Sequence, residues 1–258
     1  MIHSSIVQAV MCVIGYPVAG NAMQFAMQRA LNDAQLDCHF LSLNVHPEQF
    51  DDALRGVKAL GFRGVALAEP FESRAAEFAD ELMPMAAKAQ WVDSLCHSNG
   101  CWIGRNHLAK VVVERSREAC PTASRAIILG NGEQAKAIAA GFECGQIEVV
   151  TVDDSADAFD ESHDATYSLS DTVIIRADDD SGTPISLRQF PSLASAKPGC
   201  FVDTMIDPAE TSSLSIDTAH VSGLDIVVAR IAASFLDWTG HVANDDVLRE
   251  AVEEYFEL

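Results

Sequence analysis

The chain has 258 residues, of which 48% are apolar, and a formal net charge of −21 at pH 7. This length supports one or two domains with a large core. The negative charge argues against binding to nucleic acid or to an anionic membrane surface, because both are polyanions and the sequence has no Lys/Arg cluster. No apolar run reaches the roughly 18 residues needed to cross a bilayer, so we expect a cytoplasmic protein without a membrane partner.

The seven cysteines are irregularly spaced and mostly adjoin apolar residues, as in AVMCVIG and KPGCFVD. This pattern is typical of free thiols in a reducing compartment. One segment, CHSNGCWIGRNH, collects Cys96, His97, Cys101 and His107, but its spacing matches no zinc signature. We therefore expect loop and core thiols there and no metal site.

Strand-like and helix-like segments alternate through the first part of the chain. Apolar runs predict strands, and apolar residues at helical spacing predict helices. The predicted strands are 8–17, 38–45 and 64–68, and the predicted helices are 21–34, 47–60 and 72–90. Asn21 is a predicted N-cap, and Pro84 interrupts the last helix. This alternation favours a parallel, layered α/β unit.

A second unit follows the helix-like segment 106–119 and the breaker CPTAS. Continuous apolar runs of this kind are found in buried parallel strands. The predicted strands are 125–130, 147–154, 172–178 and 200–207, with a helix over 130–142. The tail predicts two amphipathic helices at 223–240 and 244–258, the second capped by Asn244.

Gly130, Gly132 and Ala135 fit the pattern G-x-G-x-x-[GA] between a predicted strand and a predicted helix. The glycines allow a tight turn, and the free N–H groups of the helix attract the oxygens of a pyrophosphate. Asp153 ends the next strand, where a carboxylate binds an adenosine ribose, so NAD is favoured over NADP if a cofactor binds. Glu133 competes with phosphate for the positive end of the helix. The alternative is a Rossmann-like scaffold that binds no cofactor.

Four segments together resemble the shikimate dehydrogenase family, and they are LGFRGVALAEPFE, ILGNGEQA, VDTMIDPAETSSL and GLDIVVARIAASFLDWTG. The resemblance covers essentially the whole chain, in order. It implies an α/β fold of two domains, with a layered substrate-type domain at 1–108 plus 224–258 and a Rossmann-like nucleotide-binding domain at 109–223. The C-terminal helices return to the first domain. The resemblance also implies reduction of 3-dehydroshikimate with NADPH by a catalytic lysine and a catalytic aspartate.

The same resemblance places Glu72 at the position of the catalytic lysine and Leu108 at that of the catalytic aspartate, so neither catalytic residue is expected. Most positions that bind shikimate in the family also differ, and in this chain they are Asn21, Met23, Ala66, Asp93, Ile206 and Arg230. Asn106 is retained. We expect Asn21, Glu72, Asn106 and Arg230 to line the ligand cleft.

Three hypotheses follow. The leading one is a shikimate dehydrogenase-like pseudoenzyme that is inactive on shikimate and binds NAD or an unidentified small molecule. The second is an active NAD(P)-dependent oxidoreductase on a different small molecule, with Glu72 or His107 as the acid–base group. The third is a structural partner protein. Glu72 and Arg230 are expected to form a salt bridge, to remain two solvated charges, or to bind a zwitterionic ligand between them. The sequence leaves open whether the chain forms a homodimer.

Overall fold

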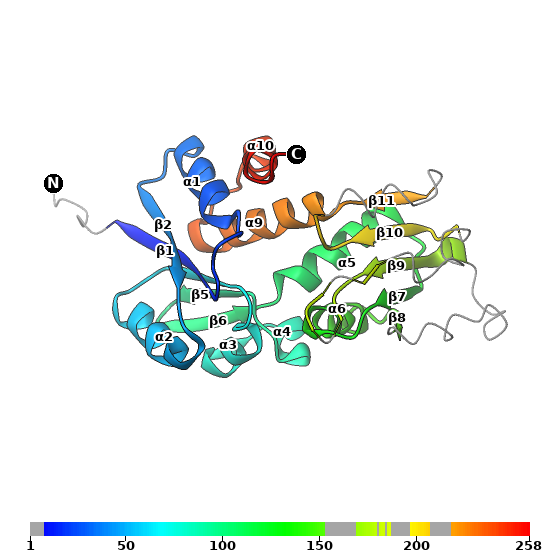
Figure 1. Ribbon diagram of the computed structural model, residues 1–258, viewed down its shortest axis with the longest axis horizontal. Helices are drawn as coiled ribbons and strands as arrows, with labels where there is room; N and C mark the ends of the chain where they lie inside the picture. The colour runs from blue at the N-terminus through cyan, green and yellow to red at the C-terminus, as the bar shows by residue number, and fades with distance from the viewer. Residues whose placement is uncertain (1–7, 153–168, 180, 184, 187–196, 207–217) are drawn as a thin grey trace. The chain divides into compact units, whose positions relative to one another are not determined.

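A computed structural model describes residues 8–152, 169–179, 181–183, 185–186, 197–206 and 218–258. The chain forms two compact units (Figure 1), one of Met1–His107 with Val228–Leu258 and one of Leu108–Val227. Each unit contains its own β-sheet flanked by helices, which confirms the predicted α/β class. The boundaries expected from the sequence lay after residue 108 and before residue 224.

The first unit contains a six-stranded sheet in the order β2-β1-β3-β5-β6-β4. The strands are β1 (Ala9–Gly15), β2 (Cys38–Asn44), β3 (Gly64–Leu67), β4 (Glu81–Leu82), β5 (Ser94–Ser98) and β6 (Cys101–Arg105). β1 pairs in parallel with β2 and β3, whereas β5 runs antiparallel to both β3 and β6. The three predicted strands, β1 to β3, are therefore parallel as expected, but the sheet as a whole is mixed because of β5, a strand that the sequence did not predict.

A two-residue turn joins β5 to β6 and explains the change of direction. Asn99 and Gly100 have φ angles of 51° and 85°. Two successive positive φ angles are typical of the type I′ turn, whose twist matches that of a hairpin. The segment with Cys96 and Cys101 is thus an ordered hairpin rather than a loop. The short strand β4 also divides the predicted helix 72–90 into α3 (Glu72–Phe78) and α4 (Pro84–Ala89).

Helices cover both faces of this sheet (Figure 1). One face carries α2 (Phe50–Ala59) and α3, and the other carries α1 (Met23–Asp33), residues 228–239 of α9 (Gly223–Thr239) and α10 (Asp245–Phe256). Successive residues of a strand point to opposite faces. Accordingly, Cys12 and Ile14 of β1 pack in the cluster that contains the stacked rings of Phe50 and Phe71, with centroids 4.3 Å apart.

Trp238 fastens α9 to the opposite face of the sheet. A Cβ atom built on Gly64 would lie 2.4 Å from the Trp238 ring, so only glycine leaves room for the indole. The Trp238 Nε1–H donates to the carbonyl of Leu95 at 3.1 Å. Since Gly64 lies on β3 and Leu95 on β5, one side chain ties α9 to two neighbouring strands.

The second unit contains a parallel sheet in the order β11-β10-β9-β7-β8. Its strands are β7 (Arg125–Leu129), β8 (Glu148–Val152), β9 (Thr172–Arg176), β10 (Cys200–Asp203) and β11 (Ala219–Val221), with helices α5 (His107–Ala119) and α6 (Glu133–Cys144). β7 lies between β8, the next strand in the chain, and β9, the strand after that, so the strand order reverses at β7. Ligands of open α/β sheets bind at such a switch point, beside the carboxyl ends of the strands.

Asn244 is the N-cap residue of α10, as expected, and its Oδ1 accepts the N–H of Asp246 at 3.2 Å. The N-cap residue of α1 is Ala22 and not Asn21, so that prediction was wrong by one residue, although Asn21 Oδ1 accepts the N–H of Met23 at 2.8 Å. Within the described ranges, no helix is long and apolar enough to cross a membrane.

Candidate functional site

The glycine-rich turn lies at the carboxyl end of β7. Gly130 has a φ of 126°, a conformation that side chains disfavour, and its N–H donates to the carbonyl of Val152 at 2.8 Å. Gly132 is the N-cap residue of α6, and no side chain of its own caps the helix. The start of α6 therefore presents backbone N–H groups that need an outside acceptor.

Asp178 supplies that acceptor. Its Oδ1 accepts the N–H of Ala135 at 2.9 Å, and its Oδ2 accepts the N–H of Gln134 at 3.3 Å. Its backbone carbonyl accepts the N–H of Gly132 at 3.0 Å. The residue is only 2% exposed. Burial raises the pKa of its carboxyl above the usual range, while the two helix N–H groups act in the opposite direction.

The hydrogen bonds of Asp178 determine whether the predicted cofactor-binding residues can bind a dinucleotide. A dinucleotide bound at such a turn places its pyrophosphate on the N–H groups that begin the helix. In this chain the Asp178 carboxylate already accepts those of Gln134 and Ala135. The residues present do not fit a pyrophosphate in this arrangement. Exposed Glu133 adds a further negative charge in the first turn, and Asp153 lies outside the described residues.

A second buried charge lies on the neighbouring strands of the same sheet. Arg176, at the end of β9, places its NH1 atom 3.1 Å from Oδ2 of Asp203, at the end of β10. Arg176 Nε donates to the carbonyl of Ile185 at 2.6 Å. Because Arg176 and Asp203 are almost fully buried, each depends on the other for its charge to be tolerated. This arginine therefore serves the protein's own structure.

Glu72 is the main titratable candidate in the first unit. It is the first residue of α3 and is only 6% exposed. Burial raises the pKa of its carboxyl from 4.5 to about 7, with Glu69 and Asp93 adding to the effect and Arg230 opposing it. A group with a pKa near the ambient pH can both give and take a proton, which is typical of an acid–base group.

Asp93 lies at the centre of this cluster. Its Oδ1 accepts the backbone N–H of His107 at 2.8 Å, and its Oδ2 lies 3.1 Å from NH2 of Arg230. The salt bridge expected between Glu72 and Arg230 is replaced by this Asp93–Arg230 pair, and Glu72 forms no ion pair with any described residue. The expectation of two solvated charges was also wrong for Glu72, because its side chain is buried.

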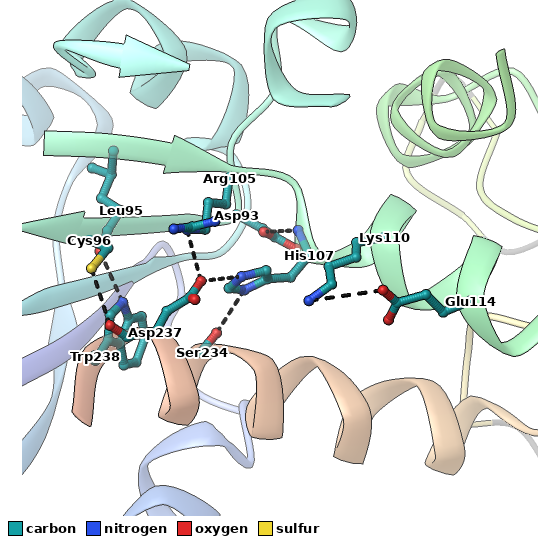
Figure 2. A network of polar contacts seen from close by, with 10 residues as sticks. All are labelled: Asp93, Leu95, Cys96, Arg105, His107, Lys110, Glu114, Ser234, Asp237 and Trp238. Atoms are coloured by element: carbon teal, nitrogen blue, oxygen red, sulfur yellow. Dashed lines mark hydrogen bonds and ion pairs between the residues drawn. The ribbon is translucent and has the colours of Figure 1, made fainter. Parts of the chain in front are cut away.

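A chain of hydrogen bonds continues from His107, as Figure 2 shows. The His107 ring lies between two side chains of α9, with Nδ1 3.1 Å from Ser234 Oγ and Nε2 2.8 Å from Asp237 Oδ2. Arg105 Nε lies 2.8 Å from the same Asp237 oxygen. Residue types alone would suggest a nucleophilic triad, but Ser234 and His107 are both only 3% exposed. We interpret these hydrogen bonds as a structural tie between α9 and β6.

The remaining predicted site residues are either buried or already hydrogen-bonded to the backbone nearby. Leu108 is fully buried and carries no polar atom on its side chain. Asn106 is only 3% exposed, so it is almost fully buried. Asn21 Oδ1 already accepts the N–H of Met23, the first residue of α1. Among the residues that the structure describes, no group of three or more His, Cys, Asp or Glu side chains could hold a metal ion.

Comparisons with known proteins point to one family. A family model described as the shikimate dehydrogenase substrate binding domain matches residues 13–94. A curated relative, the shikimate dehydrogenase (NADP(+)) of Moorella thermoacetica, is 28% identical and aligns with 98% of this chain and 96% of its own length.

Solved structures show the same fold. The shikimate 5-dehydrogenase of Thermus thermophilus, in complex with NADP(H) and shikimate, matches with a TM-score of 0.74 at 21% identity, over 96% of this chain and 100% of that one. The shikimate 5-dehydrogenase of Listeria monocytogenes, in complex with shikimate and NAD, matches with a TM-score of 0.76 at 17% identity, over 95% and 96%. At these identities the likeness establishes the fold alone.

Proposed function

Because the chain belongs to the shikimate dehydrogenase family, we propose that it keeps the family's fold, does not interconvert shikimate and 3-dehydroshikimate, and binds another small molecule around Glu72 and Arg230. One observation carries this proposal. The buried carboxyl of Glu72 stands where the resemblance puts a catalytic lysine.

Two changes remove the family's proton chemistry. A lysine ammonium is a cation that donates hydrogen bonds, whereas the Glu72 carboxyl is neutral or negative and repels a carboxylate substrate. The aspartate position holds Leu108, a fully buried hydrocarbon that cannot transfer a proton. Since general acid–base catalysis is typically worth about 10² to 10⁴ in rate, the loss of both groups leaves no useful shikimate turnover.

The charges that remain suit a different ligand. Arg230 is 30% exposed in its side chain and can bind a carboxylate while it keeps its bond to Asp93. Glu72, with a pKa of about 7, can accept a hydrogen bond from an ammonium group or donate one to a neutral acceptor. A small zwitterion with an amine and a carboxylate meets both groups, so we take this as the ligand class.

The relatives bear on the cofactor. The Moorella relative is named for NADP(+), and the two solved complexes hold NADP(H) and NAD. They favour a nicotinamide dinucleotide as the cofactor class of the family, and they lend no support to the expectation that NAD fits better than NADP. Since the Asp178 carboxylate takes the helix N–H groups, the proposed function contains no cofactor step.

One observation favours a second candidate, an oxidoreductase that acts on a different small molecule. The pKa of about 7 at Glu72 would suit it to act as the acid–base group of such an enzyme. His107, the other candidate, is less suited because both of its ring nitrogens are engaged, by Ser234 and Asp237. Turnover of a reduced dinucleotide that disappears in Glu72→Gln would establish this candidate.

The leading proposal is tested by ligand binding. Melting temperatures are measured for the wild type, Glu72→Gln and Arg230→Ala with shikimate and with each of the 20 standard L-amino acids. A ligand at about one hundred times its dissociation constant stabilises the fold by about 2.7 kcal/mol. We expect at least one amino acid, and not shikimate, to stabilise the wild type and to lose this effect in both variants. Glu77→Gln, on the exposed side of the same helix, is the matched control.

A restoration experiment tests the residue assignment. The double variant Glu72→Lys with Leu108→Asp should show at most trace shikimate oxidation, because Met23, Ala66 and Asp93 still occupy substrate positions. Robust turnover would show that the remaining positions are compatible with shikimate and would contradict the proposal.

A further inference from the structure

The first turn of α6, in the second unit, can receive a negative group. The four N–H groups at the start of a helix have no partner within the helix, and the helix dipole favours an anion there. In this chain a single side chain, that of Asp178, accepts the N–H groups of Gln134 and Ala135. The acceptor comes from the segment after β9, 43 residues further along the chain.

We infer that the Asp178 carboxylate is an internal occupant of the phosphate-binding turn, and that it prevents NAD and NADP from binding in this arrangement. The inference goes beyond the proposed function and does not depend on Glu72, which lies in the other unit.

The space at the turn supports this inference independently of the hydrogen bonds. A Cβ atom built on Gly132 would lie 2.3 Å from Asp178 Oδ2, so the carboxylate rests directly against the glycine. Glycine at this position normally lets a pyrophosphate approach the backbone closely. The carboxylate therefore fills the volume that the missing side chain provides.

Charge adds a second obstacle. Asp178 forms no ion pair with a described residue, and its negative charge faces the same N–H groups that a pyrophosphate needs. Arg176, two residues earlier, cannot neutralise an incoming phosphate without giving up Asp203 and the Ile185 carbonyl. A dinucleotide must therefore displace Asp178 before it can bind.

The segment that carries Asp178 is held in place by its own hydrogen bonds. Asp179 Oδ1 accepts the N–H groups of Ser181 and Thr183 at 2.8 and 2.9 Å. The Asp179 N–H donates to the carbonyl of Thr183 at 2.8 Å. This closed turn directly follows Asp178, whose own backbone carbonyl accepts the N–H of Gly132 at 3.0 Å.

The test is calorimetric titration of the full chain with NAD⁺ and, separately, with NADP⁺. Asp178→Ala removes both the charge and the acceptor, and Asp178→Asn keeps the side-chain shape without the charge. Glu133→Gln is the matched control, since it removes one exposed charge from the same helical turn and leaves Asp178 in place. Circular dichroism establishes that each variant is folded, and Asp178→Asn carries the test if Asp178→Ala does not fold.

We expect the wild type and Glu133→Gln to bind neither dinucleotide measurably, and Asp178→Ala to bind at least one of them at least about tenfold more tightly than the wild type. Equal gains in Asp178→Ala and Glu133→Gln would overturn the inference, because net charge would then explain the effect. Tight binding by the wild type, or no binding by folded Asp178 variants, would overturn it as well. None of these outcomes depends on shikimate turnover, so they leave the proposed function separately testable.

Discussion

Arg230 is bound to Asp93, with NH2 3.1 Å from Oδ2, and not to the neighbouring carboxyl of Glu72. Asp93 also accepts the backbone N–H of His107, so one buried carboxylate holds both the arginine and the first residue of α5. This pairing affects the pKa of Glu72. Burial and the negative charges of Glu69 and Asp93 raise that pKa, whereas the positive charge of Arg230 lowers it.

The first prediction concerns that balance. In Asp93→Asn the negative charge that helps to raise the Glu72 pKa is gone, and Arg230 is released toward Glu72. The pKa of Glu72 should therefore fall below its value of about 7, as followed by the carbon-13 chemical shift of its carboxyl. Asp51→Asn, at an exposed ion pair with Arg74, should leave the Glu72 pKa unchanged. An unchanged or higher pKa in Asp93→Asn would contradict the described cluster.

The second prediction concerns stability against pH. The folded-state pKa of Glu72 is about 7 against an ordinary 4.5, so the protonated carboxyl contributes its stability in full below pH 4.5. That contribution is lost as the pH rises through about 7. At about 1.4 kcal/mol for each pKa unit, the difference corresponds to at most about 3 kcal/mol. Glu72→Gln should accordingly raise the free energy of unfolding relative to the wild type at about pH 9, as measured by urea denaturation.

The control for this prediction lies on the same helix. Glu77 is exposed on α3, so Glu77→Gln makes the same chemical change without burial. It should alter the free energy of unfolding by no more than about 0.5 kcal/mol at any pH. If Glu72→Gln behaves like Glu77→Gln at alkaline pH, then Glu72 is not buried as described.

The third prediction concerns the tie between α9 and β6. Asp237→Asn removes the carboxylate that both His107 and Arg105 contact at 2.8 Å. Because two charged or polar partners lose a charge-assisted contact, we expect a loss of about 2 kcal/mol in chemical denaturation. Glu254→Gln, at the exposed ion pair with Arg29, should change stability by less than about 1 kcal/mol. Equal effects of the two substitutions would show that the tie contributes no more than a surface pair.

The fourth prediction concerns packing at Gly64. An alanine Cβ there would meet the Trp238 ring at 2.4 Å, so Gly64→Ala should destabilise the fold by about 3 kcal/mol. Gly56→Ala, within α2, meets no atom within 4 Å and should stabilise by about 0.5 to 1 kcal/mol. Opposite changes in melting temperature would confirm the prediction. A neutral Gly64→Ala would mean that Trp238 does not pack on β3.

Local sequence patterns predicted much of the fold, because strands, turns and helices depend largely on interactions between residues that are close in the sequence. The strand RAIILG, the glycine-rich turn after it and the following helix could be predicted from neighbouring residues alone. The structure contains all three, as β7, the turn at Gly130 and α6. The hairpin of β5 and β6 was missed although a signal was present. Asn99-Gly100 is the dipeptide that most strongly favours a type I′ turn.

The candidate site could be predicted only in part, because its decisive contacts join distant residues. Nothing local links Asp178 to Ala135, and its carboxylate looks like one more acid in the run DDD. Likewise, His107 lies 127 residues from Ser234, so only the path of α9 back to the first sheet brings them together. The resemblance pointed to Glu72 and Arg230, but the choice of Asp93 as the arginine's partner depends on tertiary geometry.

The central claim is that this chain has the family's fold without its shikimate reaction. The most direct test is steady-state oxidation of shikimate by the wild-type protein with NADP⁺ and with NAD⁺, followed by the ultraviolet absorbance of the reduced nicotinamide. We predict no rate above the enzyme-free background, however high the concentrations of substrate and cofactor. Turnover in the ordinary enzyme range, about 1 to 10³ per second, would contradict the account.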